Sequence, residues 1–122
     1  MLPSLKEGEL LLCRAPGRAV NRGDIVVFRH PQRPSMSMVK RVVGLPREAL
    51  FIEMGEVLIN GTRGLDTWGS GFTYPDGEWQ LEPDQVFVLS DNRSATRDDS
   101  RNFGPIPIVS VRCVWRRLRS RR

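Results

Sequence analysis

The chain has 122 residues, enough for one compact domain, and its hydrophobic and charged fractions of 39% and 27% exclude wholesale disorder. Its net charge of +5 is concentrated at one end, because residues 112–122 hold six arginines and no acid. The first 111 residues hold 13 basic and 14 acidic groups, a net charge of −1. A nucleic-acid-binding domain would spread positive charge over a folded face, so nucleic acid is not an expected partner.

Short segments rich in valine, isoleucine and phenylalanine alternate with turns that contain glycine or proline, a pattern typical of β-strands. The predicted strands, in chain order, are Leu10–Arg14, Asp24–Arg29, Ser37–Val43, Leu50–Glu53, Val57–Ile59, Gly77–Gln80, Gln85–Leu89 and Ile108–Leu118. No window sustains a helical stripe. We therefore expect a mostly β protein of folded antiparallel β-sheets or a partial barrel.

Two stretches between or after these strands have a distinct character. Asn60-Gly61 follows a strand and predicts a tight turn with positive φ. The polar, glycine-rich residues 62–76 are interpreted as a long surface loop, whose aromatics either cover the edge of the core or touch a partner. We expect a β domain over residues 1–111 and a basic tail over 112–122, which is either simply solvated or in contact with anionic lipid head groups.

The sequence offers few ligands for a metal or cofactor. Cys13 and Cys113 lie near opposite ends of the chain in no zinc or redox spacing, and two buried thiols are favoured over a disulfide. His30, the only histidine, lies in an Arg-His-Pro turn and is interpreted as a surface residue. No metal and no cofactor are expected. The longest apolar runs have four or five residues, so these residues contain no predicted transmembrane helix.

Two short motifs match the signature of serine β-lactamases and penicillin-binding proteins. Ser37–Lys40 spells S-x-x-K, and Ser90–Asn92 spells S-D-N. That signature requires the first motif at the start of a helix and adds a K-T-G element. Here Lys40 lies in a strand pattern and neither lysine precedes Thr-Gly, so this interpretation is rejected.

Lys40 is the strongest candidate for chemistry. Of 19 basic residues 17 are arginine, and the chain keeps a lysine beside Arg41 in a run of valines and methionines. Only lysine can lose its proton near neutral pH, and apolar surroundings favour the neutral amine that can activate a serine hydroxyl. The alternative is an edge-strand lysine that faces water.

Four segments, taken in order, resemble the signature boxes of type I signal peptidases, the serine/lysine-dyad peptidases of family S26. The match covers about residues 1–109. The matching segments are Met1–Glu9, Arg22–Phe28, Val39–Pro46, and Phe87–Arg93 followed by Asp99–Pro105. The resemblance implies the folded β-sheets of that family and an endopeptidase that removes signal peptides from secreted preproteins.

The resemblance also implies roles for individual residues. Lys40 corresponds to the general base, and Thr96 is the best match for the hydroxyl that orients it. Substrate-pocket residues would be Met1, Leu5, Met38 and Val39. Charged or polar supports of the site would be Arg41, Asp91, Asn92, Asp99, Ser100 and Arg101. The expected partners are preprotein signal peptides and a membrane surface, on the extracytoplasmic side.

The chain departs from the family pattern at several positions. Ser90 replaces the usual glycine, and Arg47 replaces the glycine of a P-G-D or P-G-E turn. The interval from Arg93 to Asp99 is one residue longer than usual, which bears on Thr96. The family's nucleophilic serine directly precedes the methionine that corresponds to Met1, and its membrane anchor lies upstream.

Three hypotheses account for the missing serine. The first is a signal peptidase whose N-terminal part lies upstream of these residues. The second is an inactive accessory module that binds an extended peptide. The third is a related serine/lysine protease with another substrate, such as a maturation peptidase. For the 122 residues alone we expect no cleavage of a preprotein peptide.

Overall fold

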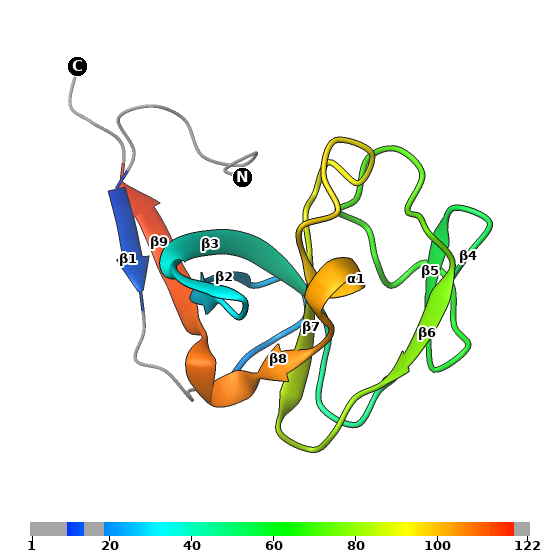
Figure 1. Ribbon diagram of the computed structural model, residues 1–122, viewed down its shortest axis with the longest axis horizontal. Helices are drawn as coiled ribbons and strands as arrows, with labels where there is room; N and C mark the ends of the chain where they lie inside the picture. Colours follow the sequence, from blue (N-terminus) through cyan, green and yellow to red (C-terminus); the bar gives the residue numbers. More distant parts are fainter. Residues whose placement is uncertain (1–9, 14–18, 119–122) are drawn as a thin grey trace.

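The computed structural model describes residues 10–13 and 19–118. Within them the chain forms nine strands, one short helix and one 3-10 turn (Figure 1). The strands are β1 (Leu10–Cys13), β2 (Ile25–His30), β3 (Arg33–Gly44), β4 (Ala49–Glu53), β5 (Glu56–Ile59), β6 (Gly77–Gln80), β7 (Gln85–Leu89), β8 (Ile106–Pro107) and β9 (Arg112–Leu118). The helix α1 is Ser100–Phe103, and the 3-10 turn is Ile108–Ser110.

The strands form two sheets in which all strand pairs are antiparallel. The larger sheet has the order β1-β9-β2-β3-β7-β8, and the smaller one has the order β5-β4-β6. Figure 1 shows the smaller sheet beyond β7, on the side opposite β1 and β9. The expectation of folded antiparallel β-sheets is confirmed, and the sheets do not close into a barrel.

Alternation of side chains explains why β2 and β3 bury one face. In β2 the buried positions are Val26, Phe28 and His30, every second residue. In the second half of β3 the buried positions begin with Met38 and Lys40 and continue with the valines that follow. Because side chains point to opposite faces with a period of two, Met38 and Val42 of β3 face the same cluster as Val26 and Phe28 of β2, whereas Val43 faces the second cluster.

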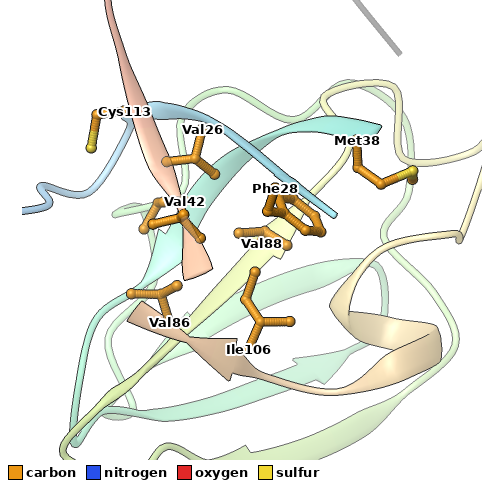
Figure 2. Close-up of a cluster of buried hydrophobic side chains, with 9 residues drawn as sticks. Val26, Phe28, Met38, Val42, Val86, Val88, Ile106 and Cys113 are labelled. Atoms are coloured by element: carbon orange, nitrogen blue, oxygen red, sulfur yellow. The ribbon is translucent and has the colours of Figure 1, made fainter. Parts of the chain in front are cut away.

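These rows build the first of two apolar clusters. Figure 2 shows side chains from β2, β3, β7, β8 and β9 converging on one another. The cluster consists of Val26, Phe28, Met38, Val42, Val86, Val88, Ile106, Val111 and Cys113. Strands far apart in sequence are therefore held together by one buried apolar patch, and burial of apolar surface is the main favourable contribution to folding.

Strand β7 is buried on both faces and connects the two clusters. Val86 and Val88 pack in the first cluster, whereas Phe87 and Leu89 pack in the second, between β7 and the smaller sheet. A strand covered on both faces requires a continuous apolar run, and the sequence Val-Phe-Val-Leu supplies one. The residue after this run, Ser90, leaves the strand in a buried position.

The segment after residue 99 differs in part from the predicted strand Ile108–Leu118. Asp99 caps α1 by accepting a hydrogen bond from the main-chain N–H of Arg101, and Gly104 ends the helix at φ +85°. The 3-10 turn follows β8, and the strand begins only at Arg112. From there β9 runs between β1 and β2 up to Leu118, so seven residues of the expected basic tail belong to the larger sheet.

No helix among the described residues has the length and apolar character needed to cross a bilayer.

Candidate active site

Lys40 occupies a core-facing position of the larger sheet rather than an exposed edge. It lies in the same row of β3 as Met38 and Val42, and it pairs directly with Val26 of β2. Only 2% of its surface is exposed. A lysine in this row is surrounded by apolar side chains, whereas a lysine one residue earlier or later would point to the other face.

The pairing of β3 with β7 sets the partner of the Lys40 side chain. Arg41 is opposite Leu89 and Val42 is opposite Val88, so the next position along this antiparallel pair sets Lys40 opposite Ser90. The Lys40 amine nitrogen Nζ lies 3.0 Å from Ser90 Oγ and donates a hydrogen bond to it. Both residues are buried.

Ser90 is held in place through its own main chain. Its N–H donates to Asp99 Oδ2 at 3.0 Å, and its carbonyl oxygen accepts from Arg93 Nε. Ser90 is not among the described non-glycine residues with positive φ, so the serine fits without the strain that a left-handed conformation would bring. That conformation occurs instead at Arg47, with φ +72°, in the turn after β3.

Asp99 and Arg101 form a buried ion pair beside Ser90. Arg101 Nη2 lies 2.7 Å from Asp99 Oδ2, and neither side chain is exposed. Arg101 also donates from Nη1 to the carbonyl oxygen of Arg93 and from Nη2 to that of Thr96. A buried charge needs a partner and further hydrogen bonds, and this pair has both. It fixes the loop that follows β7.

Burial lowers the pKa of the Lys40 amine below its ordinary value of 10.5, because the charged form loses its hydration. The negative charges of Asp99 and Asp98 raise the pKa, and the positive charge of Arg101 lowers it, but burial has the largest effect. Burial therefore shifts the equilibrium toward the neutral amine, the form that can accept a proton.

Arg41 and Asp91 form a second pair on the face of β3 opposite to Lys40. Arg41 donates from Nε and Nη2 to the two carboxylate oxygens of Asp91, at 3.0 and 2.8 Å, and from Nη1 to the carbonyl oxygen of Gly23. The Arg41 guanidinium also lies 5.7 Å from the centre of the Trp68 ring. The ion pair joins β3 to the segment after β7. The contact with Trp68 brings the loop of residues 62–76 against the Arg41 guanidinium.

The hydroxyl of Thr96 is engaged in a local hydrogen bond and not in one with the Lys40 amine. The Thr96 hydroxyl accepts a hydrogen bond from the main-chain N–H of Asp98 at 3.1 Å, and the residue lines a surface pocket beside Arg33 and Arg97. Among the described residues, the hydroxyl that accepts a hydrogen bond from Lys40 is that of Ser90. The role that the resemblance implies for Thr96 stays a prediction.

The other predicted site residues differ in burial, and two of them lie outside the described residues. Ser100 is buried, and its Oγ accepts a hydrogen bond from the N–H of Val88. Asn92 is exposed. Met38 is buried and its neighbour Val39 is half-buried, because successive residues of β3 point to opposite faces of the sheet. Met1 and Leu5 lie outside the described residues.

Arg93 is a buried residue that holds together segments near Lys40 and that the sequence did not mark as a site residue. Its side chain is fully buried, donates to both carboxylate oxygens of Asp66 at 2.6 and 2.7 Å, and donates to Thr73 Oγ1 at 3.1 Å. It thereby ties the 62–76 loop to the segment beside Lys40. The sequence pointed to Arg93 only as the arginine of the S-D-N-R run, which resembles a family box. Its role was not visible, because its acid partner Asp66 lies 27 residues away.

The interpretation of His30 as a surface residue is wrong. The residue is 1% exposed, its Nε2 lies 2.8 Å from Asp98 Oδ1, and its ring packs edge-on against Phe103. Burial favours the neutral acid at Asp98, but the hydrogen bond and charge of His30, with that of Arg33, hold the pKa of Asp98 below its ordinary value. The acid is 68 residues from the histidine, so no local pattern revealed the pair.

Neither the described cysteine nor the described acidic and histidine side chains form a metal site. Cys113 lies in the first cluster with its Sγ 3.6 Å from Asp24 Oδ2, while the side chain of Cys13 is outside the described part. Over residues 10–13 and 19–118 no group of three His, Cys, Asp or Glu side chains is arranged to hold a metal ion.

Comparison with known proteins places this geometry in context. The family model described as signal peptidase, peptidase S26, matches residues 1–116. A signal peptidase I from Leptolyngbya laminosa is 36% identical over 91% of this chain and 60% of its own length. A mitochondrial ATP-independent inner membrane protease subunit 1b from Arabidopsis thaliana is 32% identical over 95% of this chain and 63% of its own. The chain thus spans about three fifths of these curated relatives.

A solved structure gives independent support for the fold. The crystal structure of a signal peptidase I from Enterococcus faecalis V583 superimposes with a TM-score of 0.69 and 25% sequence identity. The superposition covers 81% of this chain and 98% of that one. The two-sheet architecture around Lys40 is therefore shared with a protein of known structure.

Proposed function

The chain belongs to the signal peptidase family, peptidase S26, and on that basis we propose that it forms the general-base half of a serine/lysine peptidase site that cleaves signal peptides from preproteins. The observation that carries the proposal is Lys40, an amine that is almost completely buried and hydrogen-bonded to a fixed hydroxyl. Burial lowers its pKa, as a base without histidine requires.

The chemistry assigns the proton transfers of the reaction to Lys40. The neutral amine takes the proton of a serine hydroxyl while the serine oxygen bonds to the scissile carbonyl carbon. The resulting ammonium returns that proton to the leaving amine as the peptide bond breaks, and a water molecule hydrolyses the acyl-enzyme in the same manner. In this proposal the serine directly precedes Met1, as the resemblance implies, in a protein that carries an upstream segment.

The edge of β3 next to Lys40 is suited to an extended substrate. One side of the strand pairs with β2 from Ser37 to Arg41 and again at Arg33, but on the other side β7 pairs only from Arg41 onward. Across residues 10–13 and 19–118, no strand occupies that second side before Arg41. A peptide that adds there as a strand would pass beside Lys40, with main-chain hydrogen bonds supplying affinity.

Membrane association forms part of the same proposal. The similarity to signal peptidases and to a mitochondrial inner membrane protease subunit supports the proposal that the protein acts at a membrane surface. The arginine-rich C-terminal residues would add attraction to anionic lipid head groups, worth about 1 kcal/mol per basic residue close to such a surface.

The test is a peptidase assay on the chain extended by a segment whose last residue, directly before Met1, is serine. The substrate is a synthetic preprotein peptide with alanine at the −3 and −1 positions. We expect cleavage after the −1 alanine, and a loss of about 100-fold or more in kcat/KM for Lys40→Arg, which keeps the charge but cannot act as a base. The matched control carries alanine in place of the added serine and should be inactive.

Two results would contradict the proposal. Equal cleavage by the serine and alanine forms would remove the serine mechanism. A folded serine form that binds the peptide without cleaving it would favour the inactive accessory module instead.

A further inference from the structure

We propose that Ser90 is a positioning residue that holds the Lys40 amine in the orientation needed to accept a proton. This inference deepens the proposed function and rests on it for its catalytic meaning. The contact itself is a property of the folded chain and can be tested without any turnover.

The first support is the way the hydroxyl is fixed. Ser90 is 0% exposed and directly follows β7, at the position that comes opposite Lys40 when the β3–β7 register is continued by one residue. Its N–H is bonded to Asp99 and its carbonyl oxygen to Arg93, so both sides of the residue are anchored to buried charged groups. A hydroxyl held this firmly can fix the geometry of a group that donates to it.

The second support is the chemistry of the amine. A lysine side chain has a flexible four-carbon stem, and a neutral amine has two N–H bonds and one lone pair. When one N–H donates to Ser90 Oγ, rotation about the terminal carbon–nitrogen bond is restricted. The nitrogen lone pair then points in fewer directions, so a larger fraction of the amine is oriented for proton transfer.

The burial of Ser90 distinguishes positioning from nucleophilic attack. With 0% exposure, its Oγ is not open to a peptide carbonyl in this structure, although Lys40 is close enough to take its proton. Ser90 therefore acts through Lys40 and does not touch the substrate.

The inference assigns to Ser90 the role that sequence resemblance assigned to Thr96. The Thr96 hydroxyl is used locally, as acceptor for the N–H of Asp98, and the residue lines a surface pocket. The Lys40 amine donates its hydrogen bond to Ser90 Oγ, at 3.0 Å. The serine directly after β7 thus supplies the hydroxyl that accepts the hydrogen bond of the Lys40 amine.

The experiment uses the full 122-residue chain labelled with carbon-13 at the lysine Cε. The chain has two lysines, so Lys6→Arg identifies the Lys40 signal. The variants are Ser90→Ala, Ser90→Thr, Ser90→Gly and Thr96→Val, each checked for native folding by its amide spectrum. The readouts are the pKa of Lys40 and the separation of its two ε-proton signals, which is lost when the side chain rotates freely.

We expect Ser90→Ala and Ser90→Gly to lower the pKa of Lys40 by about one unit, because the ammonium form loses an acceptor. The two ε-proton signals should also merge. Ser90→Thr, which restores a hydroxyl, should return both readouts toward the wild type, and Thr96→Val should leave them unchanged. No change in any folded Ser90 variant, or the Ser90 pattern appearing in Thr96→Val, would overturn the inference.

The serine-bearing peptidase form provides a second, opposite-signed readout. A lower Lys40 pKa alone would raise activity at neutral pH, since more of the amine would be neutral. Positioning instead predicts that Ser90→Ala reduces kcat about tenfold at unchanged KM and that Ser90→Thr restores part of it. A rise in kcat would overturn the positioning role while leaving the proposed peptidase intact; absence of activity in the parent form would bear on the peptidase alone.

Discussion

The amine of Lys40 and the hydroxyl of Ser90 lie 3.0 Å apart in the interior of the larger sheet, although 50 residues separate them in the chain. The contact arises because β3 and β7 pair in a register that puts the two residues opposite each other. An ionisable side chain thereby occupies a core row that would otherwise be filled by apolar residues.

Lys40→Met should raise the free energy of unfolding at pH 7 by about 1 kcal/mol, because the substitution removes a buried amine whose pKa is lowered on folding. Below its folded pKa, Lys40 is charged in both states and folding carries the burial penalty. As pH rises toward 10.5, the unfolded state binds more protons than the folded one, so the stability of the wild type increases. The advantage of the variant should therefore vanish at high pH.

Urea unfolding at pH 7 and above pH 10.5 measures this difference. Arg29→Met, which removes an exposed charge from the neighbouring strand, serves as the control and should show no such pH dependence. A difference between Lys40→Met and the wild type that is the same at both pH values would contradict the lowered pKa.

Asp99→Asn should lower the free energy of unfolding by about 3 kcal/mol, because it leaves the buried Arg101 guanidinium without its counter-charge. The matched control is Glu56→Gln, which breaks the ion pair with Arg63 on the surface, where both side chains are more than half exposed. That change should stay within about 0.5 kcal/mol. Chemical denaturation checks both, and similar values for the two variants would refute the structural weight given to Asp99.

Asp66→Asn should loosen the 62–76 loop, because it removes the carboxylate that pairs with the fully buried Arg93. We expect a loss of about 3 kcal/mol in the free energy of unfolding and faster amide exchange across the loop. Asp76→Asn changes an exposed acid of the same loop and should alter neither quantity. Unchanged exchange in Asp66→Asn would show that Arg93 does not anchor the loop.

His30→Ala should destabilise the protein by about 2 kcal/mol, since it removes a buried ring that packs on Phe103 and donates to Asp98. Arg33→Gln removes the more exposed partner of the same carboxylate and should change stability by less than about 0.5 kcal/mol. Thermal unfolding of the two variants distinguishes a buried structural histidine from the surface residue that its turn sequence indicates.

Much of the fold was accessible from local patterns in the sequence. Alternation in β2 and the apolar run in β7 predict strands whose ends agree with the structure to within a residue. The Asn60-Gly61 turn was predicted to take positive φ and does so, at +51° and +80°. Such features depend on neighbouring residues alone.

The failures concern pairings between distant segments. His30 lacked a visible acid because Asp98 lies on another loop, and Ser90 could be matched to Lys40 only once the register of β3 against β7 was known. The strand predicted from Ile108 begins later because a 3-10 turn after Pro107 comes first. Pattern and resemblance located Lys40, but the group that contacts it depends on tertiary pairing.

The most direct test of the account is the pKa of Lys40 itself. In the carbon-13-labelled chain with Lys6→Arg, Lys40 is the only lysine, and its Cε signal can be followed from neutral to alkaline pH while the protein stays folded. We predict a midpoint below the ordinary value of 10.5, as burial requires. A midpoint at or above 10.5 would show that the amine is an ordinary charged lysine and would contradict its assignment as the general base.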